Sequence, residues 1–201
     1  MLVSSKISVQ KSTRKAQIFN ASLELMRRMG YQSTSMRDIA SAVKMEAASL
    51  YNHISGKEVI LSETCFQMAE RLLQGLAEVN DIYFNPVEKL SLAVKNHVKV
   101  LTENTNAGWV FVHEWRHLSE ENRLRFVALR DEYEKRFTTI LKQGVDEGVF
   151  QDVNNKFAVL TILASLNWVV EWYKPQGDMT PEQIAEKLTE FILSGLKKEN
   201  N

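Results

Sequence analysis

Apolar residues recur every three or four positions along almost the whole chain of 201 residues, which is the spacing that places them on one face of an α-helix. No run alternates apolar and polar residues between turn residues in the manner of a β-hairpin. Only three prolines and eight glycines interrupt the pattern. The sequence therefore predicts an all-α fold of about nine helices, whose clearest apolar stripes consist of Phe19, Leu23 and Met26, of Phe126, Leu129, Tyr133, Phe137 and Leu141, and of Ile184, Leu188, Phe191 and Ile192.

Residues with known preferences at helix ends give several boundaries. Gly30 follows the first stripe and predicts that a helix over residues 11–29 ends there. Thr180 followed by Pro181 predicts the start of the last helix, because threonine caps a helix start and proline fits its first position. The remaining long helices are expected over residues 87–104, 107–117, 122–148 and 157–173.

The stretch after Gly30 contains two short helices joined by a tight break. Ser35 begins the first, with Asp38 three residues later as an aspartate variant of the capping box. The break falls at Lys44 and Met45, and the next helix, over residues 46–54, is rich in small and polar residues. This arrangement is typical of a helix-turn-helix, because small side chains let the second helix approach base edges in the major groove of DNA. A small helical bundle with solvated faces is the alternative interpretation.

Charge is distributed unevenly, although the formal net charge of the chain is zero. Residues 1–60 hold nine Lys and Arg against four Asp and Glu, whereas residues 61–201 hold sixteen against twenty-one. A basic head on an acidic body suggests that the head meets a polyanion.

Composition also limits the class of protein. With 44% hydrophobic and 25% charged residues, the chain is expected to fold around a sizeable core. Cys65 is the only cysteine, which favours a reducing compartment. No apolar run approaches the roughly 20 residues that a membrane-spanning helix needs, and the first residues lack the apolar core of a signal peptide. We therefore expect a cytoplasmic protein with no membrane partner.

Two stretches of the head, GYQSTSMRDIASAV (30–43) and ASLYNHISGKEVIL (48–61), resemble the DNA-binding part of the tetracycline-repressor (TetR) family of bacterial regulators. The resemblance implies an N-terminal three-helix DNA-binding domain over residues 1–56 and a larger helical domain for ligand binding and dimerisation over residues 57–201. It implies a ligand-responsive regulator, most often a repressor, that binds a palindromic operator as a dimer. No catalytic residue, cofactor or metal is expected.

Carried over position by position, the resemblance also implies DNA-contacting residues. Phosphate contacts fall to Ser35, Arg37 and Lys57, backbone contacts or bracing to Tyr51 and His53, and the groove-facing positions to Glu46, Ala47, Ala48, Ser49 and Asn52. Three positions depart from the family pattern. Lys44 stands where the turn usually has glycine, Glu46 replaces the usual small N-cap, and Ala47 replaces a common basic residue.

The last two helices are expected to form the dimer interface. Residues 157–173 are apolar on nearly all sides, so one side can meet a partner while the other meets the protein's own interior. A central core helix of a monomer is the alternative. Between head and interface, an apolar cavity for a small molecule is predicted, lined by Phe66, Trp109, His113, Phe137 and Asn167.

Three C-terminal stretches, EWRHL, LRDEYE and NWVVEWYKPQG, resemble the members of the family that sense acyl-coenzyme A thioesters or related lipid metabolites. This resemblance implies that an acyl chain occupies the apolar cavity. Basic residues such as Arg116, Arg123 or Arg130 would then hold phosphates.

Residues 113–117, HEWRH, satisfy the letters of the H-E-x-x-H zinc-protease pattern. On one helix His113 and His117 would share a face with Glu114 between them, which gives a zinc-dependent hydrolase as the alternative function. The extended pattern is absent, since Glu120 and Arg123 stand where a glycine and a third histidine would be. The match is therefore interpreted as an accident. A helical protein that binds lipid or a partner without DNA is a third interpretation.

Overall fold

The computed structural model describes residues 13–80 and 85–198. The chain divides between Ile60 and Leu61 into two compact units. Within the described residues every regular element is a helix, apart from one isolated bridge between Phe150 and Lys197. None of these helices combines the length and hydropathy needed to cross a membrane.

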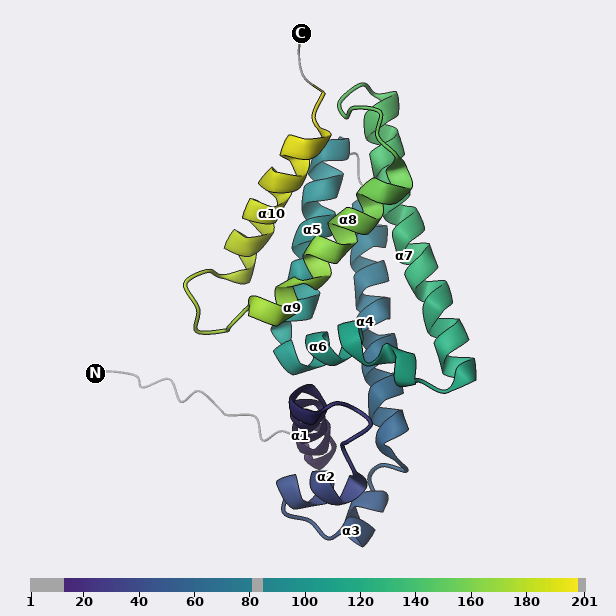
Figure 1. Ribbon diagram of the computed structural model, residues 1–201, viewed down its shortest axis with the longest axis vertical. Coiled ribbons are helices and arrows are strands. Elements are labelled where there is room, and N and C mark those ends of the chain that lie inside the picture. The colour runs from purple at the N-terminus through teal and green to yellow at the C-terminus, as the bar shows by residue number, and fades with distance from the viewer. Residues whose placement is uncertain (1–12, 81–84, 199–201) are drawn as a thin grey trace, which may run out of the picture. The chain divides into compact units, whose positions relative to one another are not determined.

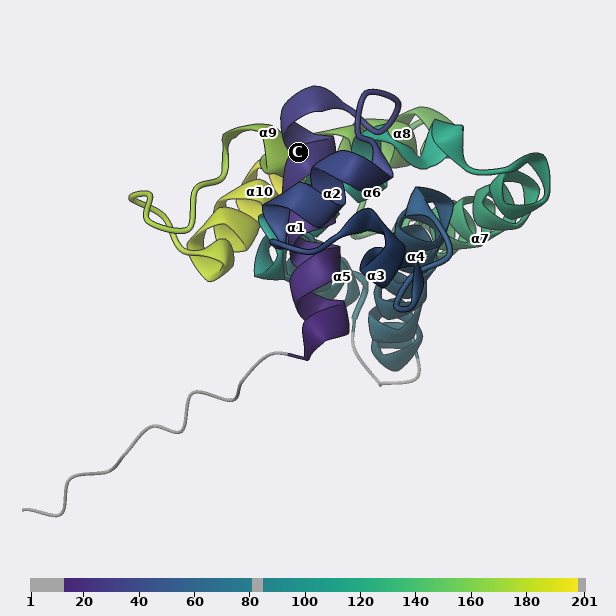
Figure 2. The ribbon, with the colours of Figure 1, turned by 90° about the horizontal axis from the view of Figure 1, so that it is seen from below.

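The first unit contains α1 (Arg14–Met29), α2 (Met36–Ala42), α3 (Ala47–Tyr51) and the first turn of α4 (Lys57–Asn80). The helix α2 packs against both α1 and α3 (Figure 2). A five-residue helix is not stable without tertiary packing. The short helices of this unit are stabilised by one shared apolar core. Its fully buried side chains include Ile18, Met26, Ile39 and Leu50.

The predicted start of α2 is confirmed. The Ser35 side chain accepts the Asp38 amide at 3.2 Å, and the Asp38 carboxylate accepts the Ser35 amide at 2.9 Å and its hydroxyl at 2.6 Å. These hydrogen bonds, the hydroxyl first, hold the pKa of Asp38 below its usual value. Helix α1 begins at Arg14, with Thr13 as its N-cap. The expected start at residue 11 lies outside the described residues.

Lys44 occupies the left-handed region between α2 and α3, with φ 54°. The amide of Met45 donates to the Ala40 carbonyl at 2.8 Å, and the amide of Lys44 donates to the Ser41 carbonyl at 3.1 Å. This is a Schellman motif, which ordinarily has glycine at the position that Lys44 fills. A side chain with a Cβ in this conformation costs about 1 kcal/mol.

The second unit contains the remainder of α4 together with α5 (Pro86–Glu103), α6 (Thr105–His113), the 3-10 turn η1 (Trp115–His117), α7 (Glu120–Asp146), α8 (Asn155–Asn167), α9 (Val169–Trp172) and α10 (Pro181–Leu196). Helix α5 is central, since α10, α7, α8, α6 and α9 all pack against it (Figure 1). The α5 side chains that form this core include Leu90, Val94, Val98 and Leu101.

Helix ends follow the sequence at most predicted positions but not at all. Thr180 caps α10 and Pro181 is its first residue, as expected. The segment 157–173 is not one helix, because α8 ends at Asn167 and α9 resumes after Trp168. When α8 and α9 are taken as one interrupted helix, the described residues hold the nine α-helices that the pattern predicted. The segment 107–117 also ends early, at His113, and continues as a 3-10 turn.

The strain at Lys44 predicts that Lys44→Gly stabilises the first unit. Glycine adopts positive φ without steric cost, so we expect the free energy of unfolding to rise by about 0.5–1 kcal/mol, net of the extra freedom that glycine has in the unfolded chain. Urea denaturation followed by circular dichroism measures the change. Ser41→Gly, at an exposed helical position of α2, is the matched control and is expected to lower stability. A lower midpoint for Lys44→Gly than for the unmodified protein would contradict the strain.

Candidate functional site

The outer side of α3 and its flanks is open to solvent. Leu50 and Ile54 point into the core of the first unit and hold the helix in place. Tyr51 is 54% exposed, and the side chains of Ala48, Ser49, Asn52 and His53 are also exposed, whereas Ala47 is half-buried. The predicted groove-facing residues therefore share an accessible surface.

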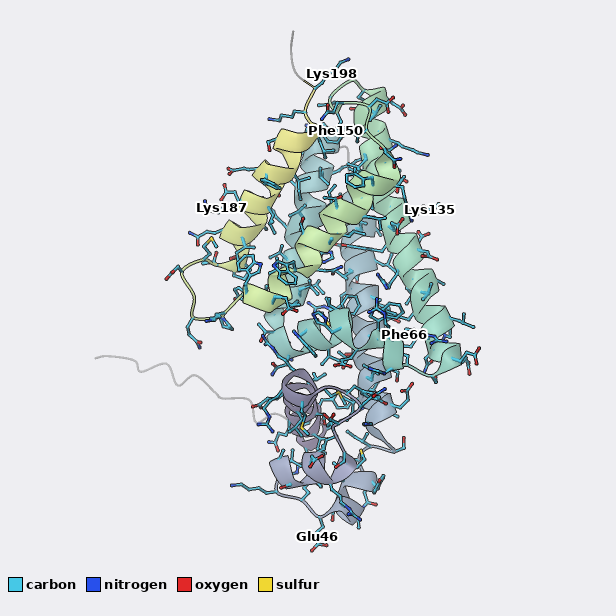
Figure 3. All side chains as sticks on the ribbon, in the orientation of Figure 1. Glu46, Phe66, Lys135, Phe150, Lys187 and Lys198 are labelled. Carbon is cyan, nitrogen blue, oxygen red and sulfur yellow. The ribbon has the colours of Figure 1, made fainter. Side chains whose placement is uncertain are left out.

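Glu46 precedes α3 as its N-cap, but its side chain makes no capping hydrogen bond. Its carboxylate points away from the ribbon (Figure 3). Ser35 and Arg37 are exposed at the start of α2. Helix starts carry free amide donors and a partial positive charge, which favours an anion there. This surface offers both short hydrogen-bonding side chains and one arginine.

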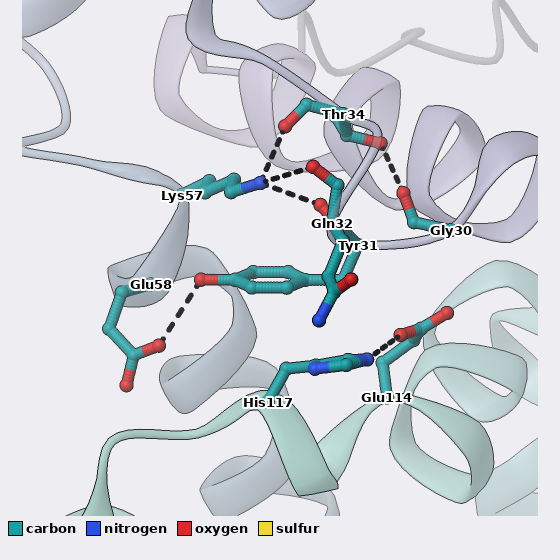
Figure 4. Close-up of polar contacts among 8 residues, drawn as sticks. All are labelled: Gly30, Tyr31, Gln32, Thr34, Lys57, Glu58, Glu114 and His117. Carbon is teal, nitrogen blue, oxygen red and sulfur yellow. Dashed lines mark hydrogen bonds and ion pairs between the residues drawn. The ribbon is translucent and has the colours of Figure 1, made fainter.

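Lys57 has a structural role in the first unit. Its ammonium donates to the carbonyls of Tyr31 at 2.7 Å, Gln32 at 3.1 Å and Thr34 at 2.8 Å (Figure 4). These carbonyls belong to the turn that connects α1 to α2. An ammonium has three N–H donors, so in this conformation none remains for the phosphate contact expected of Lys57.

Tyr31 completes this brace. The Lys57 ammonium lies 4.4 Å from the centre of the Tyr31 ring. The Tyr31 hydroxyl donates to a Glu58 carboxylate oxygen at 3.2 Å. Burial, and secondarily the charge and hydrogen bond of Glu58, raise the pKa of Tyr31 to about 12, so the phenol keeps its proton. We call Lys57, Tyr31 and Glu58 the turn brace.

A cavity of about 420 Å³ lies within the second unit. Its walls are mostly apolar, which is typical of a small-molecule site. Residues from α4, α5, α6, η1, α7 and α8 line it, and the polar ones are His97, Arg130, Asp131, Tyr133, Glu134 and Asn167.

Three of these polar side chains form one buried network. His97 is 2% exposed, with Nδ1 at 3.1 Å from the Tyr133 hydroxyl and Nε2 at 3.3 Å from the Asn167 side-chain oxygen. Burial lowers the pKa of His97 to about 4 despite the hydrogen bond to Asn167, so the imidazole is neutral near pH 7. Burial also raises the pKa of Tyr133. The network is therefore uncharged.

Two arginines pack on one tryptophan at the edge of this cavity. The guanidinium carbons of Arg116 and Arg130 each lie 4.6 Å from the centre of the Trp115 ring. Burial, followed by the charge of Arg116, lowers the pKa of Arg130. Among the described residues no carboxylate forms an ion pair with either guanidinium. An anion beside this pair would relieve the mutual repulsion.

Of the five residues predicted to line a pocket, only Asn167 lines this cavity. Phe137 is fully buried core, with its ring 5.3 Å from that of Tyr133. Phe66 packs edge-on against Phe126 at 6.3 Å. Trp109 stacks on His113 with ring centres 4.6 Å apart, and neither residue lines the cavity. Periodicity identified these aromatic residues as inward-facing, but it does not say which inward face meets a cavity.

His97 and Tyr133 were missed as pocket residues, although the sequence held a signal for one of them. His97 lies three residues after Val94 and four before Leu101, within the apolar stripe of α5. A polar side chain in such a stripe is buried and needs hydrogen-bond partners. Tyr133 carried no comparable signal, because a tyrosine in an apolar stripe is ordinary core.

The HEWRH segment does not have zinc-site geometry. Helix α6 ends at His113 and Glu114 is its C-cap, so the two histidines do not lie on one continuous helix. Nε2 of His113 lies 2.5 Å from a Glu171 oxygen. Nε2 of His117 lies instead 3.4 Å from a Glu114 oxygen, and Figure 4 shows this second contact. The described residues hold no group of three or more His, Cys, Asp or Glu placed to bind a metal.

Helices α8 and α10 expose large apolar side chains. Phe157 of α8 and Phe191 of α10 are 71% and 75% exposed and line the same groove. Trp168, between α8 and α9, is 63% exposed, and Trp172 of α9 is also exposed. Leu160 is exposed on the side of α8 that lines the cavity. On its other side α8 buries Val159, Ile162 and Leu166 against the core. The exposed faces of α8 and α10 flank a groove of about 210 Å³. We call this surface the α8–α10 face.

Comparison with known proteins assigns both parts of the chain. Residues 18–64 match the family model of bacterial regulatory proteins of the tetR family, and residues 83–196 match that of the tetracyclin repressor-like C-terminal domain. The transcriptional repressor KstR2 of Mycobacterium tuberculosis (strain H37Rv) is 23% identical over 196 residues, which cover 96% of this chain and 98% of that protein.

Solved structures agree with this assignment. The TetR-family regulator PfmR from Thermus thermophilus matches with a TM-score of 0.79 and 32% identity, covering 90% of this chain and 99% of PfmR. AibR in complex with isovaleryl coenzyme A and operator DNA matches with a TM-score of 0.76 and 28% identity, covering 89% of this chain and 97% of AibR. With its head matched to one family domain and its body to the other, this chain belongs to the TetR family of DNA-binding transcriptional regulators.

Proposed function

We propose that this protein is a cytoplasmic homodimeric repressor that binds a palindromic operator and is released by a small hydrophobic effector of the acyl-coenzyme A type. The observation that carries the proposal is the accessible polar surface of α3, held in shape by the turn brace. A reading helix must be both exposed and rigidly placed.

The surface suggests a role for each residue. Ser35 and Arg37 contact phosphates from the start of α2, where anions are favoured. Ala47, Ala48, Ser49 and Asn52 face base edges, while Tyr51 and His53 contact the DNA backbone. Glu46 repels phosphates and fits the groove only by accepting from a cytosine amine. Lys57 acts through the turn brace rather than by touching DNA.

The α8–α10 face supports dimerisation. Phe157 and Phe191 are each more than 70% exposed and line the same groove, and exposed apolar side chains gathered in this way mark a site of protein–protein contact. A second copy packed through the same face would bury them in a four-helix arrangement. Two heads would then meet half-sites roughly 34 Å apart, which is one turn of DNA.

The cavity supports an effector with an apolar body and an anionic group. Its walls suit an acyl chain, and the Arg116–Trp115–Arg130 cluster suits a phosphate or carboxylate. Arg123, the third arginine expected to hold phosphates, does not line the cavity. The related regulator AibR was crystallised with isovaleryl coenzyme A, which is consistent with this ligand class.

Helix α4 is the proposed route from effector to DNA. It begins with Lys57 of the turn brace and contains Ala69 and Leu72, which line the cavity. Fifteen residues of helix separate Lys57 from Leu72, a distance of about 22 Å. An effector that prefers a shifted α4 would change the placement of the head, with a coupling of about 1–3 kcal/mol.

The most direct test selects bound duplexes from a random DNA pool and then screens metabolites for release, acyl-coenzyme A esters first. Recovery of a palindromic sequence and its release by an ester would support both parts of the proposal. If no duplex is retained even at low salt, the DNA-binding part fails.

Arg37 and Lys57 are expected to respond differently to mutation. Arg37→Gln removes one phosphate interaction per subunit. The slope of log affinity against log salt concentration should therefore become shallower by about 0.9 for each phosphate contact that is lost. Lys57→Met should instead lower the free energy of unfolding by about 2 kcal/mol, because three carbonyls lose a charged donor. Fluorescence anisotropy and urea denaturation measure the two effects. Lys135→Gln, which removes an exposed positive charge from α7, is the control for both.

The double substitution Phe157→Asp with Phe191→Asp should yield a monomer. Carboxylates cannot be buried in an apolar interface without a large desolvation cost. Light scattering would report half the molecular mass, and operator affinity would fall by at least about 100-fold because a single head reads only one half-site. Leu124→Asp alters a side chain of α7 that is 66% exposed and should leave the mass unchanged. A dimer in the double variant would refute this interface.

Arg130→Gln should weaken release of the operator by acyl-coenzyme A esters by at least about tenfold, because a charged hydrogen bond to the effector is lost. Arg123→Gln is the matched control, since Arg123 is exposed on the same helix and does not line the cavity. Release is followed by anisotropy of labelled operator across a concentration series of ester. Equal effects of the two substitutions would argue against the Arg116–Trp115–Arg130 cluster.

A further inference from the structure

The network of His97, Tyr133 and Asn167 brings together side chains from α5, α7 and α8 on the wall of the cavity. His97 and Tyr133 are buried and Asn167 is half-buried, so each side chain loses hydration and needs hydrogen-bond partners. Neither the turn brace nor the α8–α10 face involves these residues. Their arrangement bears on what the cavity accepts.

The hydrogen atoms of this network follow from its geometry. The Asn167 atom that faces Nε2 of His97 is the side-chain oxygen, which can only accept. Nε2 therefore carries the proton of the neutral imidazole. Nδ1 is then an acceptor, and the Tyr133 hydroxyl donates to it. The donors run from Tyr133 through His97 to Asn167.

This direction leaves Asn167 with unused donors. Its oxygen is occupied by His97, which fixes the orientation of the amide group. Among the described residues no protein acceptor takes an N–H of its nitrogen Nδ2. Asn167 is half-buried and lines the cavity beside the apolar residues Leu163 and Ala164. The amide nitrogen is thus an oriented donor in largely apolar surroundings.

We propose that Asn167 donates to a neutral carbonyl oxygen on the buried part of the effector, with His97 and Tyr133 as positioning residues. Two sources share this chemistry, the carbonyl of a thioester and a ketone on the carbon skeleton. A carboxylate is disfavoured at this position, because the network is uncharged and the cavity wall also holds Asp131 and Glu134. The anionic part of the effector lies instead at the Arg116–Trp115–Arg130 cluster. The inference rests on the effector pocket of the proposed function.

Pairs of probes that differ only at the carbonyl test this donor. Octanoyl-coenzyme A is compared with S-octyl-coenzyme A, which lacks the thioester carbonyl. A medium-chain keto acid is compared with the saturated acid and the hydroxy acid of the same length. Dissociation constants are measured by calorimetry on the full-length protein, and operator release is measured for the same probes.

We expect the carbonyl member of one pair to bind about tenfold more tightly than its partner, since a bound ligand that lacks the acceptor covers the Asn167 N–H and leaves it without a hydrogen bond. The pair that shows the difference identifies the source of the carbonyl. In Asn167→Leu the two dissociation constants of that pair should differ by no more than about twofold. The variant should largely retain its affinity for the probe that lacks the carbonyl. Asn167→Asp, which keeps the shape and removes the donor, should lose the ratio as well and serves if the leucine variant does not fold.

Val127→Ala is the matched control, because Val127 lines the same cavity and offers no hydrogen bond. It should weaken both members of each pair alike. Three outcomes would overturn the inference: a ratio that persists in both Asn167 variants, a preference for the hydroxy acid, or no difference within any pair.

The outcome for the proposed function is separable. If octanoyl-coenzyme A releases the operator but the pairs are not discriminated, only the carbonyl interaction fails. If no probe binds while the operator is still retained, the effector class and the carbonyl interaction both fail, and DNA binding stands.

Discussion

Three hydrogen bonds from the Lys57 ammonium to the carbonyls of residues 31, 32 and 34 tie the start of α4 to the turn between α1 and α2. Helix α3 has five residues and packs against α2, so its orientation depends on the tertiary contacts of the first unit. The carbonyls of a turn need hydrogen-bond donors that the turn itself does not provide. The ammonium of Lys57 supplies these donors. The same residue begins the helix that contributes Ala69 and Leu72 to the cavity of the second unit.

The cavity of the second unit has polar side chains within an apolar core, where a polar group without a hydrogen-bond partner is destabilising. His97 is neutral because its burial lowers its pKa, and both ring nitrogens are paired. Arg116 and Arg130 place positive charge at one edge of the cavity, where the indole ring of Trp115 covers part of each guanidinium. Asp131 and Glu134 also line the cavity, so the uncharged network is bordered by charges of both signs.

Helix α8 has one side buried in the core of the second unit and another side with exposed apolar side chains. Val159, Ile162 and Leu166 of α8 fill the core, while Phe157 and Trp168 remain exposed. Phe157 and Phe191 line the groove between α8 and α10, so exposed apolar side chains of the two helices meet there.

The sequence by itself determined the helices, their caps and the family. The pairs Ser35 with Asp38 and Thr180 with Pro181 act over three residues or fewer, and the motif between Gly30 and Glu58 has fixed spacing, so local order is enough to read them. Only the tertiary structure decided that Lys57 braces a turn more than twenty residues earlier and that His97 meets Asn167 seventy residues later. It also decided that Phe137 is core and that His113 and His117 pair with different carboxylates. Periodicity gives the inward face of a helix, but the rotation of each helix against its neighbours decides which side chains meet, and that rotation follows from packing across the whole unit.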